Sequence, residues 1–270
     1  MAEEWVLRIW MALIYVASAV FYWSYFVHKR PRWGQWATRL LLSGIVLHTA
    51  LLGVRTLESR HLPFATLPES ISFCVWLFAL AYLYLEHRLK EKSLGPFILT
   101  MVSMVVLVLL WSMPKSGPLP GILRTYLFGI HVSAALLGYA FFALSFVSSL
   151  TYTLLFHEIH SKRLRFFYAR LPSLETLDHL SRQAVWAGFL ALTVAIAVGA
   201  FWAFRAWGSL SDPKYVAVVA TWLIYAAYIH THSSRGWRGQ KSAYLSIVGF
   251  VCVVVVYTAF NMVFTRVHAW

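Results

Sequence analysis

Residues 183–204 read QAVWAGFLALTVAIAVGAFWAF, an apolar run without a single Asp, Glu, Lys or Arg. A run of this length exceeds the roughly 18 residues that mark a membrane-spanning helix. A short polar break, residues 207–215 (WGSLSDPKY), follows it, and a second apolar run then covers residues 215–229. Two such runs predict a pair of membrane helices with residues 207–215 at one membrane face.

The composition of the chain extends this prediction to all 270 residues. Hydrophobic residues make up 60% and charged residues 12%, and the mean hydropathy is +0.67. Soluble domains carry about twice that charged fraction. We therefore expect an all-α polytopic membrane protein, one integral-membrane domain over 1–270, in the bacterial inner (plasma) membrane. Hydropathy predicts eight spans, at about 6–27, 38–55, 69–86, 94–112, 127–156, 183–205, 215–231 and 243–265.

The basic residues in the predicted loops give the orientation. One set of alternate loops contains 15 of the 23 Lys and Arg residues, and the other contains 8. Because loops rich in Lys and Arg stay in the cytoplasm, both termini are predicted outside, on the same side as residues 207–215. The longest cytoplasmic loop, about 157–182, includes Ser173, a candidate cap for a short helix on the inner membrane surface.

The net charge of +13 does not indicate a nucleic-acid partner. Positive cytoplasmic loops facing anionic membrane lipid explain it, and no basic domain stands outside the apolar runs. Cys74 and Cys252 lie in apolar segments without CxxC spacing, which is typical of small core residues.

Four histidines occupy positions that favour a function. His48 lies in the second predicted span, His131 near the outer end of the fifth, His230 at the inner end of the seventh and His268 just beyond the eighth. Ionisable residues at membrane depth are costly, and neutral imidazole is an iron ligand in haem proteins. The outward His131 and His268 could hold haem iron, with basic loop residues near the propionates.

The alternative for each of these residues is structural. A single buried histidine in a helix bundle is commonly a hydrogen-bonding core residue, and His268 could be an interfacial residue. Asp212 before Pro213 is explained by loop capping. No nucleophile–base pair, glycine-rich phosphate loop or HExxH motif is present, so we do not expect an enzyme.

An ordered set of segments resembles the cytochrome c assembly membrane protein family, which includes CcsA-type and HemX-type members. The segments are residues 131–140 (HVSAALLGYA), 171–178 (LPSLETLD), 188–193 (GFLALT), 222–230 (WLIYAAYIH) and 236–239 (GWRG), followed by Asn261 and His268. The resemblance is closest over 127–270. Each segment alone is weak, whereas their order is specific.

The resemblance implies a haem protein. It makes His131 and His268 the axial ligands of a haem, beside an outward tryptophan-rich loop that includes Trp207 and Asp212. We expect this haem to be haem b. It makes His230 part of a haem site deeper in the membrane, and several members carry a histidine where His48 stands.

The loop departs from the family pattern, because it is shorter, lacks further tryptophans and has Tyr215 in place of the usual Glu. On this ground we expect a HemX-type protein that regulates tetrapyrrole synthesis through glutamyl-tRNA reductase. The alternatives are a CcsA-type protein that delivers haem for c-type cytochrome assembly with an outward partner, and a small-molecule transporter.

Overall fold

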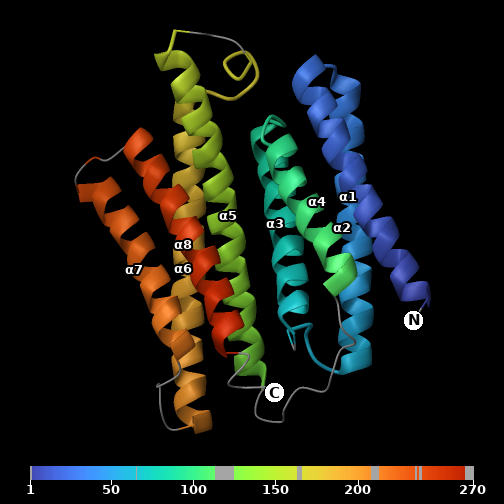
Figure 1. The fold of residues 1–270 in the computed structure, drawn as a ribbon, viewed down its shortest axis with the longest axis vertical. Coiled ribbons are helices and arrows are strands. Elements are labelled where there is room, and N and C mark those ends of the chain that lie inside the picture. The colour runs from blue at the N-terminus through green and yellow to red at the C-terminus, as the bar shows by residue number, and fades with distance from the viewer. Residues whose placement is uncertain are drawn as a thin grey trace. The chain divides into compact units, whose positions relative to one another are not determined.

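A computed structural model describes residues 2–64, 66–112, 125–162, 166–207, 213–234, 236 and 239–264. The protein is all-α in these residues, with no strand among them, as expected (Figure 1). The helices are α1 (Ala2–His28), α2 (Pro31–Ser59), α3 (Leu67–Leu89), α4 (Gly95–Ser112), α5 (Tyr126–His160), α6 (Leu174–Trp207), α7 (Pro213–Ser234) and α8 (Gln240–Phe264).

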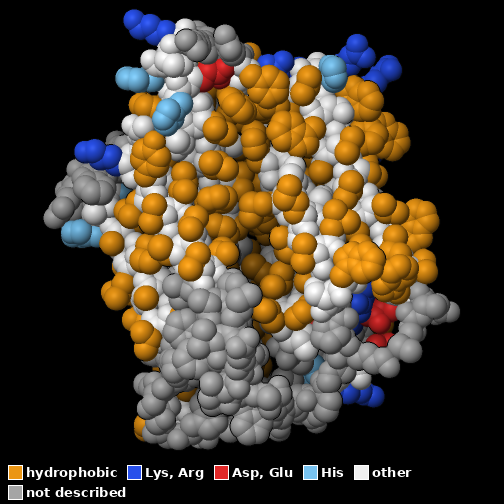
Figure 2. All heavy atoms as spheres, viewed as in Figure 1, with side chains coloured by type: hydrophobic (Ala, Val, Ile, Leu, Met, Phe, Trp, Pro, Cys, Tyr) orange, Lys and Arg blue, Asp and Glu red, His pale blue; other side chains and the backbone are white. Residues whose placement is uncertain are grey.

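The helices carry their apolar side chains outward as well as inward. Six of them, α1 to α6, contain a stretch long and apolar enough to cross a membrane. Figure 2 shows hydrophobic side chains along the helices and Lys and Arg side chains toward helix ends. An apolar exterior of this kind is stable only against lipid. The protein is thus a multi-pass membrane protein; spanning by α7 and α8 and the outside location of both termini stay predictions.

Several helices are longer than the apolar runs that predicted them. The predicted span 183–205 is the later part of α6, which begins at Leu174. Ser173 does cap a helix, since its Oγ accepts from the Thr176 N–H at 3.2 Å, but that helix is α6 itself and not a separate short one. The polar residues Asp178 and Arg182 end the apolar run without ending the helix, because helix propensity does not depend on hydropathy.

The chain divides into two compact units. Unit 1 comprises Met1–Thr125 with Leu164–Pro172 and contains α1 to α4; unit 2 comprises Tyr126–Arg163 with Ser173–Trp270 and contains α5 to α8. Each is described by itself below. The prediction of one integral-membrane domain over 1–270 stays a prediction.

A buried carboxylate joins three helices of unit 1 near one of their ends. Glu86 of α3 accepts hydrogen bonds from Tyr22 of α1 and Thr38 of α2. Lys92 completes the group, with its Nζ 2.7 Å from Glu86 Oε1. A buried charge is tolerated when it is paired and hydrogen-bonded in this way, so the network joins the helices at this end.

Close packing between α5 and α6 builds the centre of unit 2. A Cβ at Gly188 would lie 3.0 Å from the Gly138 carbonyl oxygen and 2.7 Å from the ring of Phe142. Phe142 in turn stacks on Tyr225 of α7 at a centroid distance of 3.6 Å. Small residues that let helix backbones approach are the usual contact between membrane helices.

Buried serine hydroxyls add polar contacts within unit 2. Ser145 of α5 lies 2.8 Å from Ser181 of α6 and 2.7 Å from Ser246 of α8, oxygen to oxygen. Ser149 is also 2.8 Å from Ser181. Hydroxyl contacts between helices hold a bundle together where lipid offers no hydrogen bonds.

Candidate functional site

His131 stands on the second turn of α5 and turns its ring toward α6. Its Nδ1 lies 2.7 Å from the backbone carbonyl oxygen of Ala195. A carbonyl can only accept, so Nδ1 carries the proton and Nε2 keeps its lone pair. Among the described residues, none makes a hydrogen bond to His131 Nε2. This is the arrangement in which protein histidines bind metals, with the second nitrogen oriented by a backbone carbonyl.

A glycine on α6 makes this position possible. A Cβ at Gly199 would lie 2.3 Å from His131 Nδ1 and 2.5 Å from Cε1. Any side chain there would displace the ring from Ala195. The sequence motif 131–140 indicated the histidine but not Gly199, because the pairing of α5 with α6 is a tertiary contact.

His230 and His232 lie on different sides of α7. The buried stripe of this helix follows Thr221, Tyr225, Tyr228 and His232, and His230 lies exposed outside it. His230 is therefore on the surface of unit 2, and the site deeper in the membrane with which the resemblance associates it stays a prediction.

His232 was not singled out from the sequence. Its side chain is buried, it stacks on Tyr228 at 6.1 Å, and neither ring nitrogen has a hydrogen-bond partner in the described residues. The helical spacing from Tyr225 and Tyr228 contained the signal that His232, not His230, faces inward.

His48 is buried in unit 1 with both ring nitrogens engaged. Nδ1 lies 3.3 Å from the Tyr15 hydroxyl, and Nε2 lies 2.9 Å from Ser72 Oγ. Ligation of a metal would break one of these contacts. This geometry fits the structural interpretation of His48, in which it is a buried core histidine with both ring nitrogens hydrogen-bonded.

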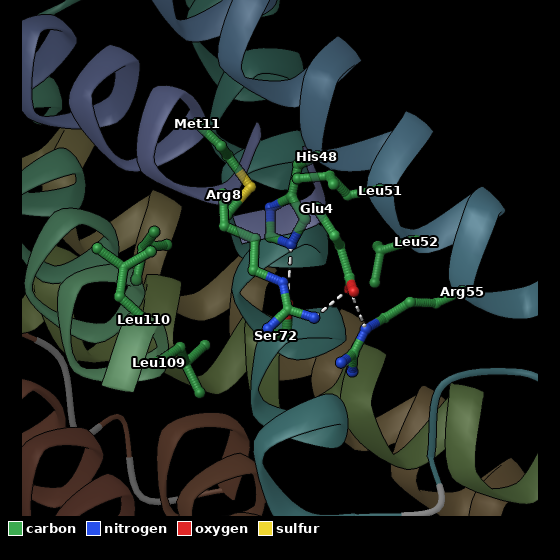
Figure 3. A pocket seen from close by; sticks show the side chains of 11 residues that line it. Glu4, Arg8, Met11, His48, Leu51, Leu52, Arg55, Ser72, Leu109 and Leu110 are labelled. Carbon is green, nitrogen blue, oxygen red and sulfur yellow. Dashed lines mark hydrogen bonds and ion pairs between the residues drawn. The ribbon is translucent and has the colours of Figure 1, made fainter. Parts of the chain in front are cut away.

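The cavity beside His48 has a mostly apolar lining that includes three charged residues, Glu4, Arg8 and Arg55. In Figure 3, Arg8 and Arg55 both point to Glu4, and Arg55 Nε lies 3.1 Å from Glu4 Oε1. Arg55 Nη1 also pairs with the buried Glu69 at 2.9 Å. The cavity measures about 30 Å³. Since ligand sites measure roughly 300–1,000 Å³, it has room for water and not for haem.

The other predicted site residues fall largely outside the described part. Asp212 and His268 both lie outside the described residues. Trp207 is the last residue of α6, and its side chain is not described. The structure therefore brings His131 to Ala195 and Gly199 but does not test its pairing with His268. Within the described ranges, no three His, Cys, Asp or Glu side chains form a group that could hold a metal ion.

Comparison with known proteins shows which sequences this chain is similar to. A family model described as "Cytochrome C assembly protein" matches residues 64–268. A protein named "Cytochrome c biogenesis protein CcsA" from Guillardia theta is 32% identical over 82% of this chain and 81% of its own length. A protein of the same name from Synechococcus sp. (strain CC9902) is 31% identical over 96% of this chain and 93% of its own length. Another, from Prochlorococcus marinus (strain MIT 9313), is 32% identical over 85% of this chain and 81% of its own length.

These relatives correct one expectation. The reduced loop favoured the HemX-type branch and regulation of glutamyl-tRNA reductase, but the similar proteins carry the name CcsA. The HemX-type assignment and the reductase as a partner were therefore wrong. Loops in general vary more among homologues and tolerate insertions and deletions better than helices do, so loop length is a poor guide to the branch.

The family resemblance itself is confirmed, and the bacterial relatives are consistent with the bacterial inner membrane predicted for the chain. With a family model covering most of its length and relatives above 30% identity, the chain belongs to the cytochrome c assembly protein family.

Proposed function

We propose that this protein handles haem for the assembly of c-type cytochromes and delivers it on the outer side of the membrane. The proposal rests on the name of the CcsA relatives, cytochrome c biogenesis protein. The observation on this chain that supports it is the contact of His131 Nδ1 with the Ala195 carbonyl oxygen, which leaves Nε2 available for a metal. In the proposed topology all eight helices span the membrane and both termini lie outside, which brings the end of α5 near His131 to the outer face.

His131 is the first proposed axial ligand of the haem iron, which is cargo in this function. Its Nδ1–H donates to the Ala195 carbonyl at 2.7 Å, which holds the ring in one tautomer and makes Nε2 a better electron-pair donor. The residues present thus fit one axial position. The bound iron would supply the affinity for imidazole, and the chain supplies the orientation.

His268 is the second proposed ligand, with Trp207 and Asp212 on the adjoining loop. His230, exposed on α7, is a second choice suited to a site shared with another membrane subunit. His48 is left out of the ligand set, because its two ring nitrogens already contact Tyr15 and Ser72. We propose haem b as the cargo, and an outward assembly partner that receives it with the apocytochrome.

Substitution of His131 tests the function. Cells whose only copy of the gene encodes His131→Ala should lose haem-stained c-type cytochromes, and the purified variant should lose the Soret absorption that wild type shows with haem. The loss of affinity should exceed the roughly 10- to 100-fold effect of removing an outer hydrogen-bond partner from a metal site. Added imidazole should restore part of the Soret band, because it can replace the missing ring.

His157→Ala is the matched control. His157 lies on the same helix and is exposed. Its contacts among the described residues stay on its own helix: its Nδ1 lies 2.8 Å from the Thr153 carbonyl oxygen, and its ring meets the ring of Phe156 edge-on. The control should retain both cytochromes and Soret band. Normal c-type cytochromes in a strain lacking the gene would reject the proposed function, and an unchanged Soret band in His131→Ala would reject the ligand.

A further inference from the structure

A second site candidate lies in unit 1, where α1 turns into α2. Six residues line a surface pocket of about 550 Å³: Phe21, Arg30, Pro31, Arg32, Trp33 and Trp36. This volume lies within the range of small-molecule sites, and the lining combines two cations with three aromatic rings. None of these residues belongs to the proposed haem site.

The pocket lies at a membrane face. Both α1 and α2 are long and apolar enough to span, and only Lys29 and Arg30 separate them. A two-residue connection between consecutive spans leaves Arg30 and Arg32 at the level of the lipid headgroups. Trp36, with 51% of its surface exposed, is of the type that lies in this interfacial layer.

The two arginines lack counter-ions within the part of the chain that is described. The ion pairs found there use Arg8, Arg55 and Lys92, and none uses Arg30 or Arg32. Lys29, the neighbouring cation, is different, because its Nζ donates to the Arg170 carbonyl at 2.9 Å. Two exposed guanidinium groups beside a cavity therefore keep their donors for an external anion.

The start of α2 adds to the positive charge. Arg30 is its N-cap residue and makes no side-chain cap, and no acidic residue stands in the first turn. In the same unit, α3 begins with Thr66 and Glu69, which cap each other's backbone groups. The first turn of α2 thus supplies no carboxylate of its own to the positive end of the helix dipole, and a phosphate would be stabilised there.

The aromatic residues form an apolar wall below the arginines. Phe21 of α1 and Trp33 of α2 are in ring contact at 5.3 Å, and Arg39 extends over Trp36 at 5.2 Å. An acyl chain or glycerol backbone can lie against such a wall while its phosphate meets the cations. This combination fits an amphiphile with an anionic head better than a free anion.

We infer that Phe21, Arg30, Arg32, Trp33 and Trp36 form a binding site for one anionic phospholipid, with its phosphate at the two arginines. The negative lipid surface contributes on the order of 1 kcal/mol per nearby Lys or Arg. Replacement of both arginines should therefore weaken the lipid by roughly 30-fold.

Native mass spectrometry of the full-length protein can measure this. The protein in detergent micelles is mixed with equal amounts of phosphatidylglycerol and phosphatidylcholine. Wild type should retain one phosphatidylglycerol preferentially, and Arg30→Gln/Arg32→Gln should lose that preference. The conservative Arg30→Lys/Arg32→Lys variant should show an intermediate preference, because lysine keeps the charge but not the two-pronged geometry.

Arg88→Gln/Lys90→Gln is the matched control. It removes two exposed charges of unit 1 at the C-terminal end of α3, outside the pocket lining. Retention of the preference in the control and its loss in Arg30→Gln/Arg32→Gln support the site, provided the circular dichroism spectra agree. Equal losses in both would overturn it in favour of general surface charge, and equal retention would overturn it outright.

Two competition experiments separate the ligand from other anions. Inorganic phosphate at millimolar concentration should not displace phosphatidylglycerol from wild type, and displacement would identify a free-phosphate site instead. Haem should bind the Arg30→Gln/Arg32→Gln variant as it binds wild type. Loss of the Soret band in that variant would make the pocket a tetrapyrrole site and overturn the lipid assignment.

Discussion

At the scale of single residues, neighbours decide what each histidine can do. His131 and His48 both lie inside predicted spans, yet His131 has one nitrogen held by a carbonyl and His48 has both nitrogens occupied. A metal needs a free lone pair, so only the first is ready to ligate. Burial at membrane depth, which drew attention to both, does not separate them.

Gly199→Ala should disturb His131 without removing it. The new Cβ would lie 2.3 Å from Nδ1, so the ring must leave the Ala195 carbonyl. We expect haem affinity to fall about 10- to 100-fold, as when a metal-binding histidine loses its outer partner. A haem titration followed at the Soret band measures the change.

Gly53→Ala is the control for that substitution. Gly53 lies exposed in α2, and its Cβ would meet nothing within 4 Å. The control should bind haem as wild type does and be slightly more stable, since alanine favours a helix by up to about 1 kcal/mol over glycine. Equal haem affinity in Gly199→Ala and wild type would contradict the role given to the His131–Ala195 contact.

At the scale of elements, the pairing of α5 with α6 positions His131. Gly138 and Gly188 let the two backbones approach, and the hydroxyls of Ser145 and Ser181 meet farther along the same pair. The site thus depends on a close helix contact several turns away from it. Lipid gives no hydrophobic drive for this contact, so its fit matters more than its apolarity.

Gly188→Leu should force α5 and α6 apart. Its Cβ alone would lie 2.7 Å from the Phe142 ring and 3.0 Å from the Gly138 carbonyl oxygen. Overpacking of this kind costs about 1–3 kcal/mol, which a denaturant titration of the purified protein can measure. Ala197→Leu, at an exposed position of α6, should leave the free energy of unfolding within about 0.5 kcal/mol. Similar values for the two variants would show that the contact is loose.

The elements also show where sequence patterns are informative. The all-α class followed from apolar runs alone, and α1 to α6 carry the expected membrane character. Helix ends were less predictable, because Asp178 and Arg182 continue α6 beyond the apolar run. The inward position of His232 was within reach, since Tyr225, Tyr228 and His232 share one helix face. The position of His230 at the inner end of the predicted span and the family resemblance directed attention to His230 instead.

At the scale of the whole molecule, the distribution of positive charge predicts the orientation. Of the 23 Lys and Arg residues, 15 lie in the loops assigned to the cytoplasm. With the predicted eight spans, this distribution predicts both termini outside. Alkaline phosphatase fused to either terminus should therefore be active, and green fluorescent protein fused there should be dark. An active phosphatase at one terminus only would require an odd number of spans.

The sequence by itself determined that this is a helical membrane protein of the cytochrome c assembly family. The length of an apolar run indicates a membrane span because the bilayer thickness sets how many residues a spanning helix needs. The order of several local motifs indicates the family, and both signals can be read without knowing how the helices pack. Loop length pointed to the wrong branch, because a loop is less constrained than a packed helix.

Only the tertiary structure decided which histidine keeps a ring nitrogen without a hydrogen bond, and which arginines lack a counter-ion, among the residues that the structure describes. His131 depends on Ala195 and Gly199, more than sixty residues away along the chain, and no local pattern contains that contact. The pocket at Arg30 and Arg32 likewise needs Phe21 from the preceding helix. Hydrogen bonds and ion pairs between helices depend on how the helices pack, and hydropathy does not record that packing.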